Sequence, residues 1–409
     1  MNGVVRRLAV LSLHTSPLVQ PGSGDSGGMN VYIRELAASL AQAGVATDVY
    51  TRRWTADGPD IVDVEPGFRV VHVPAGPPEL PKEALPDVVD EFADGVRDHL
   101  APDVDVLHAN YWLSGVAGHR LKHELGLPLV STFHTLARVK AEAGLFDEPE
   151  LRAKAEAEVV GCSDAILANC EAEARQLVEL YDADPARIEL VPPGVDHAFF
   201  SPGPRAGARA ALPHLRLGDE PVLLFVGRIQ PLKSLDVAVR ALAELDDPHA
   251  VLVVVGGASG ADGDREFERV RKLVVDLGVA DQVRFTDPQP HHLLSTYYRA
   301  ADVMVVPSRT ESFGLVALEA AACGTPVVAA AVGGLRTLVE HGRTGYLVDR
   351  PDPSEYAAHI RRILDDPDLD RRLSANAARR ARDYTWSTAA ARLRRLYADI
   401  TAGSLVECA

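Results

Sequence analysis

The chain has few cysteines and no long apolar run. Four of its 409 residues are cysteine, and neither a C-x-x-C pair nor histidines at the sequence spacing of a zinc site accompany them. We therefore expect free thiols in a reducing compartment at Cys162, Cys170, Cys323 and Cys408. Nowhere do roughly 18 apolar residues follow one another, which predicts a chain without a membrane-spanning helix.

Positive charge is also scarce, since the formal net charge is −16. Such a chain repels the phosphate backbone of DNA and RNA, so nucleic-acid binding is not expected. A phosphorylated substrate would need a local cluster of Arg and Lys. The apolar run Leu8–Leu13 is too short for a signal peptide and leads into a glycine-rich stretch, which predicts a cytoplasmic protein.

The length predicts more than one domain, because single hydrophobic cores stop growing at roughly 250–300 residues. Short β-branched runs alternate with amphipathic stretches, a pattern typical of α/β domains with parallel sheets. The helical pattern is clearest over residues 30–43 and again over 384–400. The predicted strands are Leu8–Leu13, Val45–Thr51, Arg69–Val73, Val104–Ala109, Leu129–Phe133, Ala165–Ala168, Ile188–Val191, Val222–Val226, Val251–Val255, Val283–Thr286, Val303–Val306, Val327–Ala330 and Tyr346–Val348.

A Pro-, Gly-, Ala- and Arg-rich stretch from Pro192 to Pro213 separates the two series of strands and is interpreted as a linker. We predict two Rossmann-like, doubly wound domains at residues 1–198 and 199–382, with a final helix at 383–409 that returns to the first domain. Ligands of such sheets bind beyond the carboxyl ends of the strands, so the site is expected in a central cleft that the two domains face.

Two loops predict anion binding. Gly22–Asn30 is glycine-rich and precedes a helix, whose free N–H groups attract phosphate. A plain flexible loop would also explain this composition. Gly227–Lys233 follows the first strand of the second domain and carries Arg228 and Lys233. An Arg fork and a Lys point charge five residues apart can hold a diphosphate.

A third motif, Glu311–Glu319, has two glutamates eight residues apart. We place Glu311 in a loop and Glu319 one turn into a helix, where Gly314 and Leu315 offer N-terminal amides. The glycines at 256–260 are better explained by close packing than by a cofactor. His108 and His134 end strands of the first domain, and for His134 a catalytic and a structural role are left equally open.

The three motifs together resemble the family-four retaining glycosyltransferases of GT-B fold, and the resemblance covers the whole chain. The residues that carry it are S-G-G-M-N-V-Y at 26–32, G-R-x-x-P-x-K at 227–233 and E-S-F-G-L-V-A-L-E at 311–319. The stretches H-T-S-P-L at 14–18, Y-W-L-S-G at 111–115 and H-T-L at 134–136 are similar to the subfamily of mycothiol synthesis. That subfamily joins N-acetylglucosamine from UDP-GlcNAc to an inositol phosphate.

The resemblance implies the site residues. Catalysis would involve Arg228, Lys233, Glu311 and His134. The implied donor contacts are Gly28, Gln20, Pro21, Arg228, Lys233, Gln289, Glu311, Phe313, Gly314, Leu315 and Glu319. Gln289 stands where the family usually has a basic residue. The implied acceptor contacts are His14, Asp25, Asn30, Lys82, Tyr111, Thr135 and Arg152.

No cofactor is expected in catalysis, because Arg and Lys would stabilise the leaving diphosphate. The family also suggests a structural Mg²⁺ near Tyr298, Arg299, Ala301 and Thr325, for which the residue types themselves give no argument.

Alternatives remain. A related enzyme could use another sugar phosphate or cyclitol, as a sucrose-phosphate synthase or a secondary-metabolite enzyme does. A non-catalytic binding protein would need neither Glu311 nor the Arg228 and Lys233 pair, and a dehydrogenase would need an intact dinucleotide fingerprint. Oligomeric state is open, with a homodimer as one option.

Overall fold

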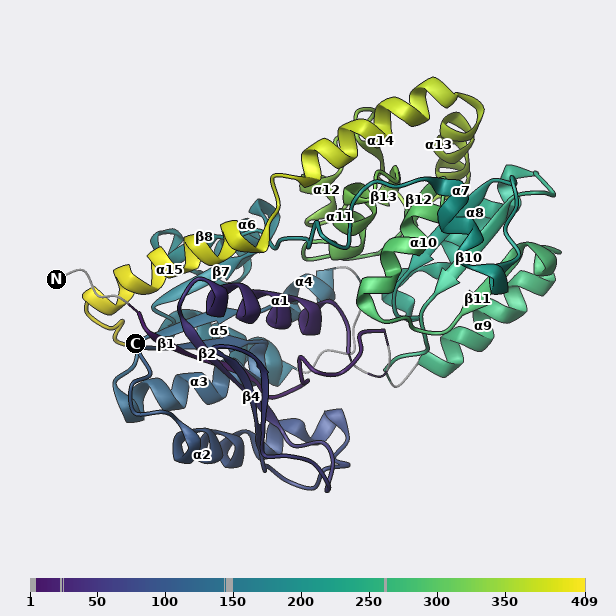
Figure 1. The fold of residues 1–409 in the computed structure, drawn as a ribbon. Helices are drawn as coiled ribbons and strands as arrows, with labels where there is room; N and C mark the ends of the chain where they lie inside the picture. The colour runs from purple at the N-terminus through teal and green to yellow at the C-terminus, as the bar shows by residue number, and fades with distance from the viewer. Residues whose placement is uncertain are drawn as a thin grey trace. The chain divides into compact units, whose positions relative to one another are not determined.

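The computed structural model describes residues 5–22, 24, 26–142, 144, 150–260 and 263–408. The chain forms two compact units, each built around its own sheet (Figure 1). The first unit comprises residues 1–19, 29–192 and those from 386 onward, and the second comprises 20–28 and 193–385. The predicted borders lie a few residues away, except that the glycine-rich loop at 20–28 groups with the second unit.

The first unit has an eight-stranded sheet in the order β3-β4-β2-β1-β5-β6-β7-β8. Its paired strands are parallel except β3 and β4, which are antiparallel. The strand β3 was not predicted, because this edge strand is partly exposed and partly charged and so lacks the buried apolar pattern. The strands are β1 (Arg7–Ser12), β2 (Ala46–Arg52), β3 (Ile61–Glu65), β4 (Phe68–Val73), β5 (Val106–Asn110), β6 (Leu129–Thr132), β7 (Ala165–Ala168) and β8 (Ile188–Leu190).

Helices bury the remaining apolar surface of this sheet. Phe92 and Val96, four residues apart on α2, are fully buried in the same core as Leu107 of β5, as expected for an amphipathic helix on a parallel sheet. The helical elements are α1 (Gly28–Gln42), η1 (Lys82–Val88), α2 (Val89–His99), α3 (Trp112–Leu125), α4 (Ala137–Glu142), α5 (Glu150–Cys162), α6 (Glu171–Tyr181), η2 (Pro185–Arg187) and α15 (Trp386–Ala402).

The last helix, yellow in Figure 1, completes the first unit. The hydroxyl of Tyr397 lies 2.8 Å from Nδ1 of His108, whose Nε2 lies 2.9 Å from the Thr132 hydroxyl. Arg392 donates to the Leu190 carbonyl of β8 at 3.1 Å. These contacts fix α15 to the sheet although more than 190 residues separate it from the strands it touches.

The second unit has a six-stranded parallel sheet in the order β11-β10-β9-β12-β13-β14. Its four central strands are buried throughout, as expected when helices cover both faces of a sheet. The strands are β9 (Val222–Val226), β10 (Val251–Val255), β11 (Val283–Thr286), β12 (Val303–Val306), β13 (Val327–Ala330) and β14 (Gly345–Val348).

Part of the predicted linker is helical, which corrects the interpretation of 192–213 as a plain connection. In α7 (Arg205–Ala210), Arg209 is buried and donates to the Ala300 carbonyl at 3.0 Å and to Asp302 at 2.8 Å. These contacts anchor the segment to the second unit. The other helical elements there are η3 (Pro213–Leu215), η4 (Pro231–Lys233), α8 (Leu235–Leu245), α9 (Gly263–Asp276), η5 (Ala280–Gln282), η6 (His291–Leu293), α10 (Leu294–Ala300), α11 (Leu315–Ala322), α12 (Leu335–Leu338), α13 (Pro353–Asp365) and α14 (Pro367–Ala381).

Two of the four cysteines are paired, which corrects the expectation of four free thiols. Cys162 forms a disulfide with Cys408 across 246 positions of sequence. Cys170 and Cys323 are buried and take no part in a disulfide. Among the described residues, no helix combines the length and apolar character needed to cross a membrane.

The buried His108 makes the first unit acid-sensitive. Burial lowers its pKa to about 3, so the folded chain keeps this ring neutral while the unfolded chain protonates it below about pH 6.5. The free energy of unfolding should therefore decrease as the pH is lowered from 6.5 to 3, with His108 contributing up to about 1.4 kcal/mol per pH unit. Urea denaturation of wild type and His108→Gln at several pH values should show a flatter slope in the variant. The exposed control His99→Gln should keep the wild-type slope, and equal slopes in wild type and His108→Gln would contradict the prediction.

Candidate active site

In the first unit, several of the predicted acceptor residues come together beyond the carboxyl ends of β1, β5 and β6. Asn30, on the first turn of α1, is almost completely buried. Its side-chain amide donates to the Thr15 hydroxyl at 2.7 Å and to the Ser16 carbonyl at 2.6 Å. These bonds tie the start of α1 to the segment that follows β1 and that also carries His14.

Arg152 is the principal cation of this half-site. Its side chain is nearly inaccessible, and its Nε donates to Glu156 at 2.7 Å, one turn further along α5. Its Nη2 donates to the Thr135 carbonyl at 2.8 Å and to the Thr135 hydroxyl at 2.9 Å. The other oxygen of Glu156 accepts from the Ala137 N–H at 2.9 Å and from the Tyr181 hydroxyl. The guanidinium is thus held in one orientation, as a planar fork for an anion must be.

Tyr111 connects Arg152 with His14. Its ring lies 4.9 Å beneath the guanidinium carbon of Arg152 and 4.8 Å from the ring of His14. Tyr111 is the N-cap of α3 and has a φ of 74°, which is unusual for an aromatic residue. We take this backbone strain as an indication that the position of the ring matters for function.

His134 is held in a left-handed conformation with a φ of 62°. Its Nε2 lies 2.8 Å from the Asn110 side-chain oxygen, and its ring packs 4.8 Å from that of Tyr32. Enclosure by protein, with smaller contributions from His108 and His14, lowers its pKa to about 3. The ring is therefore neutral near pH 7, so it can offer hydrogen bonds but not the proton of an imidazolium.

Of the two remaining predicted acceptor residues, only Lys82 lies in the described part of the chain. Lys82 is exposed at the first residue of η1. Asp25 lies outside the described residues.

In the second unit, the glycine-rich loop lies against the segment after β11. Gln20 donates to the Pro288 carbonyl at 2.8 Å, and a Cβ on Gly22 would meet the Pro288 ring at 3.2 Å. Ser259 donates to the Gly24 carbonyl. These contacts place Gln20 and Pro21, both predicted donor residues, with the second unit. Gln289, also predicted, is half-buried and donates to the Asp287 carbonyl at 2.9 Å.

Arg228 is positioned by two residues that the sequence analysis did not single out. Its Nη1 is 3.4 Å from the Ser259 hydroxyl, and Gln230 donates to the same hydroxyl at 3.2 Å. The backbone of Gly27 lies so close that a Cβ there would be 3.1 Å from the Arg228 Nε. Glycine at position 27 therefore leaves room for the guanidinium.

Lys233 and Glu311, which the sequence analysis assigned to the diphosphate and the sugar, contact each other directly. The Lys233 Nζ lies 2.6 Å from a Glu311 oxygen, and both side chains keep some exposure, 22% and 14%. A partly exposed ion pair is weakly held, so both partners can turn to a ligand. We infer that the pair keeps each side chain in reach of the same ligand.

A pair of glycines supports the Glu311 loop and was missed in the sequence. The N–H of Gly334 donates to the Glu311 carbonyl at 3.0 Å. A Cβ on Gly333 or Gly334 would collide with the backbone of Glu311 or Phe313. The signal that could have revealed them is a Gly-Gly pair shortly after a strand end, where close backbone approach is expected.

Glu319 is buried within α11, as the predicted position one turn into a helix requires. One oxygen lies 2.7 Å from Nε2 of His291, and the other accepts from the Tyr298 hydroxyl at 2.7 Å. Next to this carboxylate, burial and charge raise the pKa of the Tyr298 hydroxyl, so the phenol stays protonated and donates. Both oxygens are therefore oriented, and a ribose hydroxyl could bind by donating to one of them.

The start of α11 contains the remaining predicted donor residues. Gly314 is the N-cap with a φ of 100°, which favours glycine, and Leu315 is the first helical residue. A Cβ on Gly28 would lie 3.6 Å from the Leu315 side chain, which brings this third predicted residue alongside. Phe313 is buried, with its ring 5.9 Å from that of Tyr384.

The residues suggested for a structural Mg²⁺ offer only neutral oxygens. The carbonyl of Tyr298 accepts from the Thr325 hydroxyl at 2.6 Å and from the Ala301 N–H at 3.3 Å. Arg299, the fourth residue, brings a positive charge that donates to Ser295 and Ser201. Because protein sites usually hold Mg²⁺ through carboxylates, these four residues fit the ion poorly, and we assign it no part in the reaction.

Two family models match most of the chain. Residues 26–199 match the family described as "Glycosyltransferase Family 4", and residues 212–380 match "Glycosyl transferases group 1". The chain is 48% identical to the D-inositol 3-phosphate glycosyltransferase of Thermobispora bispora, over 97% of this chain and 95% of that protein. It is 49% identical to the protein of the same name from Thermomonospora curvata, over 96% and 95%.

The chain belongs to the family-four glycosyltransferases. Among solved structures, this glycosyltransferase is similar to a sucrose-phosphate synthase from Thermosynechococcus elongatus, with a TM-score of 0.91 and 34% identity over 97% of this chain and 99% of that one. WaaG, a glycosyltransferase of lipopolysaccharide biosynthesis, shares the fold with a TM-score of 0.72 at 20% identity, over 97% of this chain and all of that one. The predicted GT-B fold is confirmed.

In this glycosyltransferase, Lys233→Ala should lower kcat strongly. If Lys233 contacts the diphosphate as the sequence predicts, the change removes a cation that stabilises the leaving group, and loss of one such donor costs roughly 10²–10³ in rate. Steady-state release of the nucleotide product would measure the effect. Lys272→Ala, on the exposed face of α9, is the matched control and should keep wild-type activity. A loss of less than about tenfold in Lys233→Ala would exclude the role.

Proposed function

We propose that the enzyme transfers N-acetylglucosamine from UDP-GlcNAc to D-inositol 3-phosphate with retention at the anomeric carbon, as the first step of mycothiol synthesis. The observation that carries the acceptor assignment is the full-length identity of 48–49% to D-inositol 3-phosphate glycosyltransferases, against 34% to a sucrose-phosphate synthase. The donor sugar rests on the motif resemblance.

The first unit would hold the acceptor. Its oriented Arg152, with the Thr135 hydroxyl 2.9 Å away and the Tyr111 ring beneath, would be the cation that meets the acceptor phosphate in a chain of net charge −16. A phosphate bound there would fix the cyclitol and aim one ring hydroxyl, which lowers the entropic part of the barrier. His14 and Asn30 would line the ring.

The second unit would hold the donor. Glu319 would accept from the ribose, backbone near Pro288 and Gln289 would hold the uracil, and Glu311 would accept from sugar hydroxyls. Arg228, Lys233 and the N–H groups at Gly314 and Leu315 would stabilise the negative charge that develops on the departing diphosphate.

The reaction would not need a covalent intermediate. In the proposed step the acceptor hydroxyl forms the new bond to the anomeric carbon on the face from which UDP leaves, and a diphosphate oxygen takes the proton of that hydroxyl. Because Arg228 and Lys233 supply positive charge to the diphosphate, transfer should proceed in EDTA.

The substrate test is UDP release from UDP-GlcNAc in EDTA, with and without D-inositol 3-phosphate, and with the product identified by mass. We expect release that depends on the acceptor and a product that gains one N-acetylhexosamine. A response to fructose 6-phosphate but not to inositol phosphate would overturn the acceptor and favour the synthase-like alternative. UDP-glucose as the better donor would overturn the sugar.

The acceptor assignment can be tested through Arg152. Removing this residue alone would leave Glu156 as a buried unpaired charge and would unfold the site, so the two charges should be removed together. Arg152→Met combined with Glu156→Gln should raise the KM for inositol phosphate more than about tenfold, the effect of losing charge-assisted hydrogen bonds. The KM for UDP-GlcNAc should stay unchanged. An unchanged acceptor KM in a folded double variant would contradict the assignment.

A further inference from the structure

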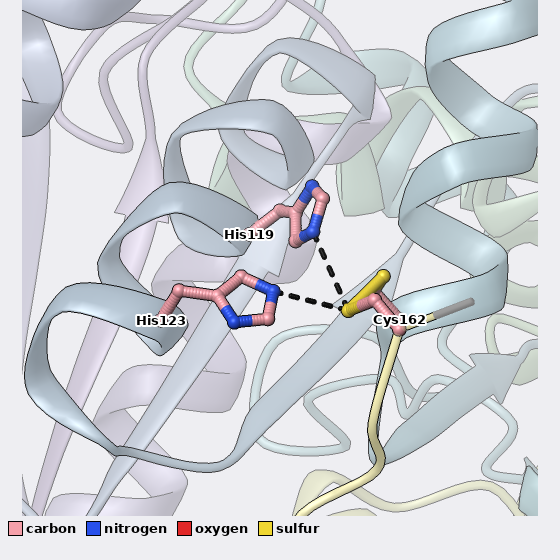
Figure 2. Close-up of side chains that lie close together, drawn as sticks. His119, His123 and Cys162 are labelled. Atoms are coloured by element: carbon pink, nitrogen blue, oxygen red, sulfur yellow. Dashed lines mark hydrogen bonds between the residues drawn. A yellow bond between two sulfur atoms is a disulfide. The ribbon is translucent and has the colours of Figure 1, made fainter.

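Two histidines flank the disulfide of the first unit. His119 and His123 lie four residues apart on α3 and project from the same face toward Cys162 at the end of α5 (Figure 2). The Sγ of Cys408 lies 3.5 Å from Nε2 of His119 and 3.0 Å from Nε2 of His123. The four ligand atoms all lie within 4.8 Å of one another.

A disulfide does not by itself explain why two histidine rings point at it, because its sulfurs are weak hydrogen-bond acceptors. Two nitrogens and two sulfurs, however, are the donor set of a common structural zinc site. With Zn–N near 2.05 Å and Zn–S near 2.3 Å, a tetrahedral ion separates its N and S ligands by about 3.5 Å. Histidines at i and i+4 of a helix are a known way to present two ligands to one ion.

We propose that His119, His123, Cys162 and Cys408 bind one Zn²⁺ in tetrahedral geometry when the two cysteines are reduced. The Cα atoms of the cysteines are 4.9 Å apart, so side-chain rotation alone can separate the sulfurs to the roughly 3.8 Å that a shared ion requires. Cys162 is buried, His119 and Cys408 are partly exposed, and His123 is exposed, which leaves a path for the ion.

The surrounding contacts hold the ligands in place whether or not the sulfurs are bonded. Asp164 accepts from the Val406 N–H of the C-terminal tail at 2.7 Å and from the Leu129 N–H of β6 at 2.7 Å. The buried Lys122 pairs with Asp164 at 2.9 Å and donates to the Cys162 carbonyl at 2.7 Å. The tail that carries Cys408 is therefore bound to the unit through its backbone.

The disulfide and the zinc site are two forms of the same four side chains. Two molecules of a low-molecular-weight thiol open the disulfide: their two electrons break the S–S bond, their two hydrogens pass to Cys162 and Cys408, and they leave as their own disulfide. Zinc binding to the two thiols then releases two protons as the Zn–S bonds form. In a reducing compartment the metal form would be the one that ties the C-terminus to the first unit.

The test uses the full chain, reduced with dithiothreitol and freed of thiol by gel filtration under argon. Zinc bound in competition with a chromophoric chelator gives stoichiometry and affinity, and Co²⁺ substitution reports tetrahedral thiolate ligation by its absorption spectrum. We expect one zinc per reduced chain, none per oxidised chain, and a Co²⁺ spectrum with thiolate charge-transfer bands. A reduced chain that binds no zinc, or a disulfide that thiols cannot open, would overturn the proposal.

Variants identify the ligands. Cys408→Ser, in the tail after α15, and His123→Ala, on the exposed face of α3, should each weaken zinc binding by more than about tenfold. Losing even an outer-shell partner costs about tenfold, so losing a direct ligand should cost more. The matched controls Cys170→Ala and His99→Ala should bind zinc as the wild type does. Wild-type affinity in Cys408→Ser would exclude the site. None of the four residues is among those proposed to bind substrate, so this result and the transfer assay fail independently.

Discussion

The proposed phosphate sites depend on a few cationic side chains that are held in place within a strongly acidic chain. With a net charge of −16, the protein attracts no polyanion by its overall field. Two of the side chains proposed to bind phosphate are each paired with a carboxylate: Arg152 with Glu156, and Lys233 with Glu311. The two pairs differ in burial, and this difference decides what each can do. The buried Arg152 pair is fixed and suits a site that must hold a ligand in one orientation, whereas the partly exposed Lys233 pair can exchange its partner during a reaction.

Close approach to glycine backbone shapes the second unit. Gly334 hydrogen-bonds to the Glu311 carbonyl, and Gly27 leaves space for Arg228. Neither function requires chemistry of the glycine itself; each requires the absence of a side chain. Glu319 illustrates the complementary principle, because a buried carboxylate is tolerated when Tyr298 and His291 occupy both of its oxygens.

Much of this arrangement could be predicted from the sequence, because strands buried on both faces leave a clear apolar pattern and the anion-binding motifs follow strand ends. The structure places all thirteen predicted strands in the two sheets, with ends that differ by at most two residues. The exposed β3 left no such pattern, and α7 lies in a stretch whose Pro and Gly content favoured a linker. The cluster around Cys162 could not be found by spacing rules, since its members come from α3, α5 and the tail, and only folding brings them together. For the same reason the partners of Glu319, which lie on η6 and α10, were not visible before the structure.

The first unit is discontinuous, and its final helix contributes Tyr397 to the partner set of His108. During synthesis, the sheet of this unit emerges from the ribosome long before α15 exists, and residues 193–385 of the second unit are translated in between. The second unit, nearly continuous in sequence, can complete its own core first, although domains are generally expected to fold from the N-terminus. The first unit therefore leaves the binding surface of α15 uncovered until that helix has been translated. The unit that begins the chain therefore cannot complete its core until most of the second unit has been translated.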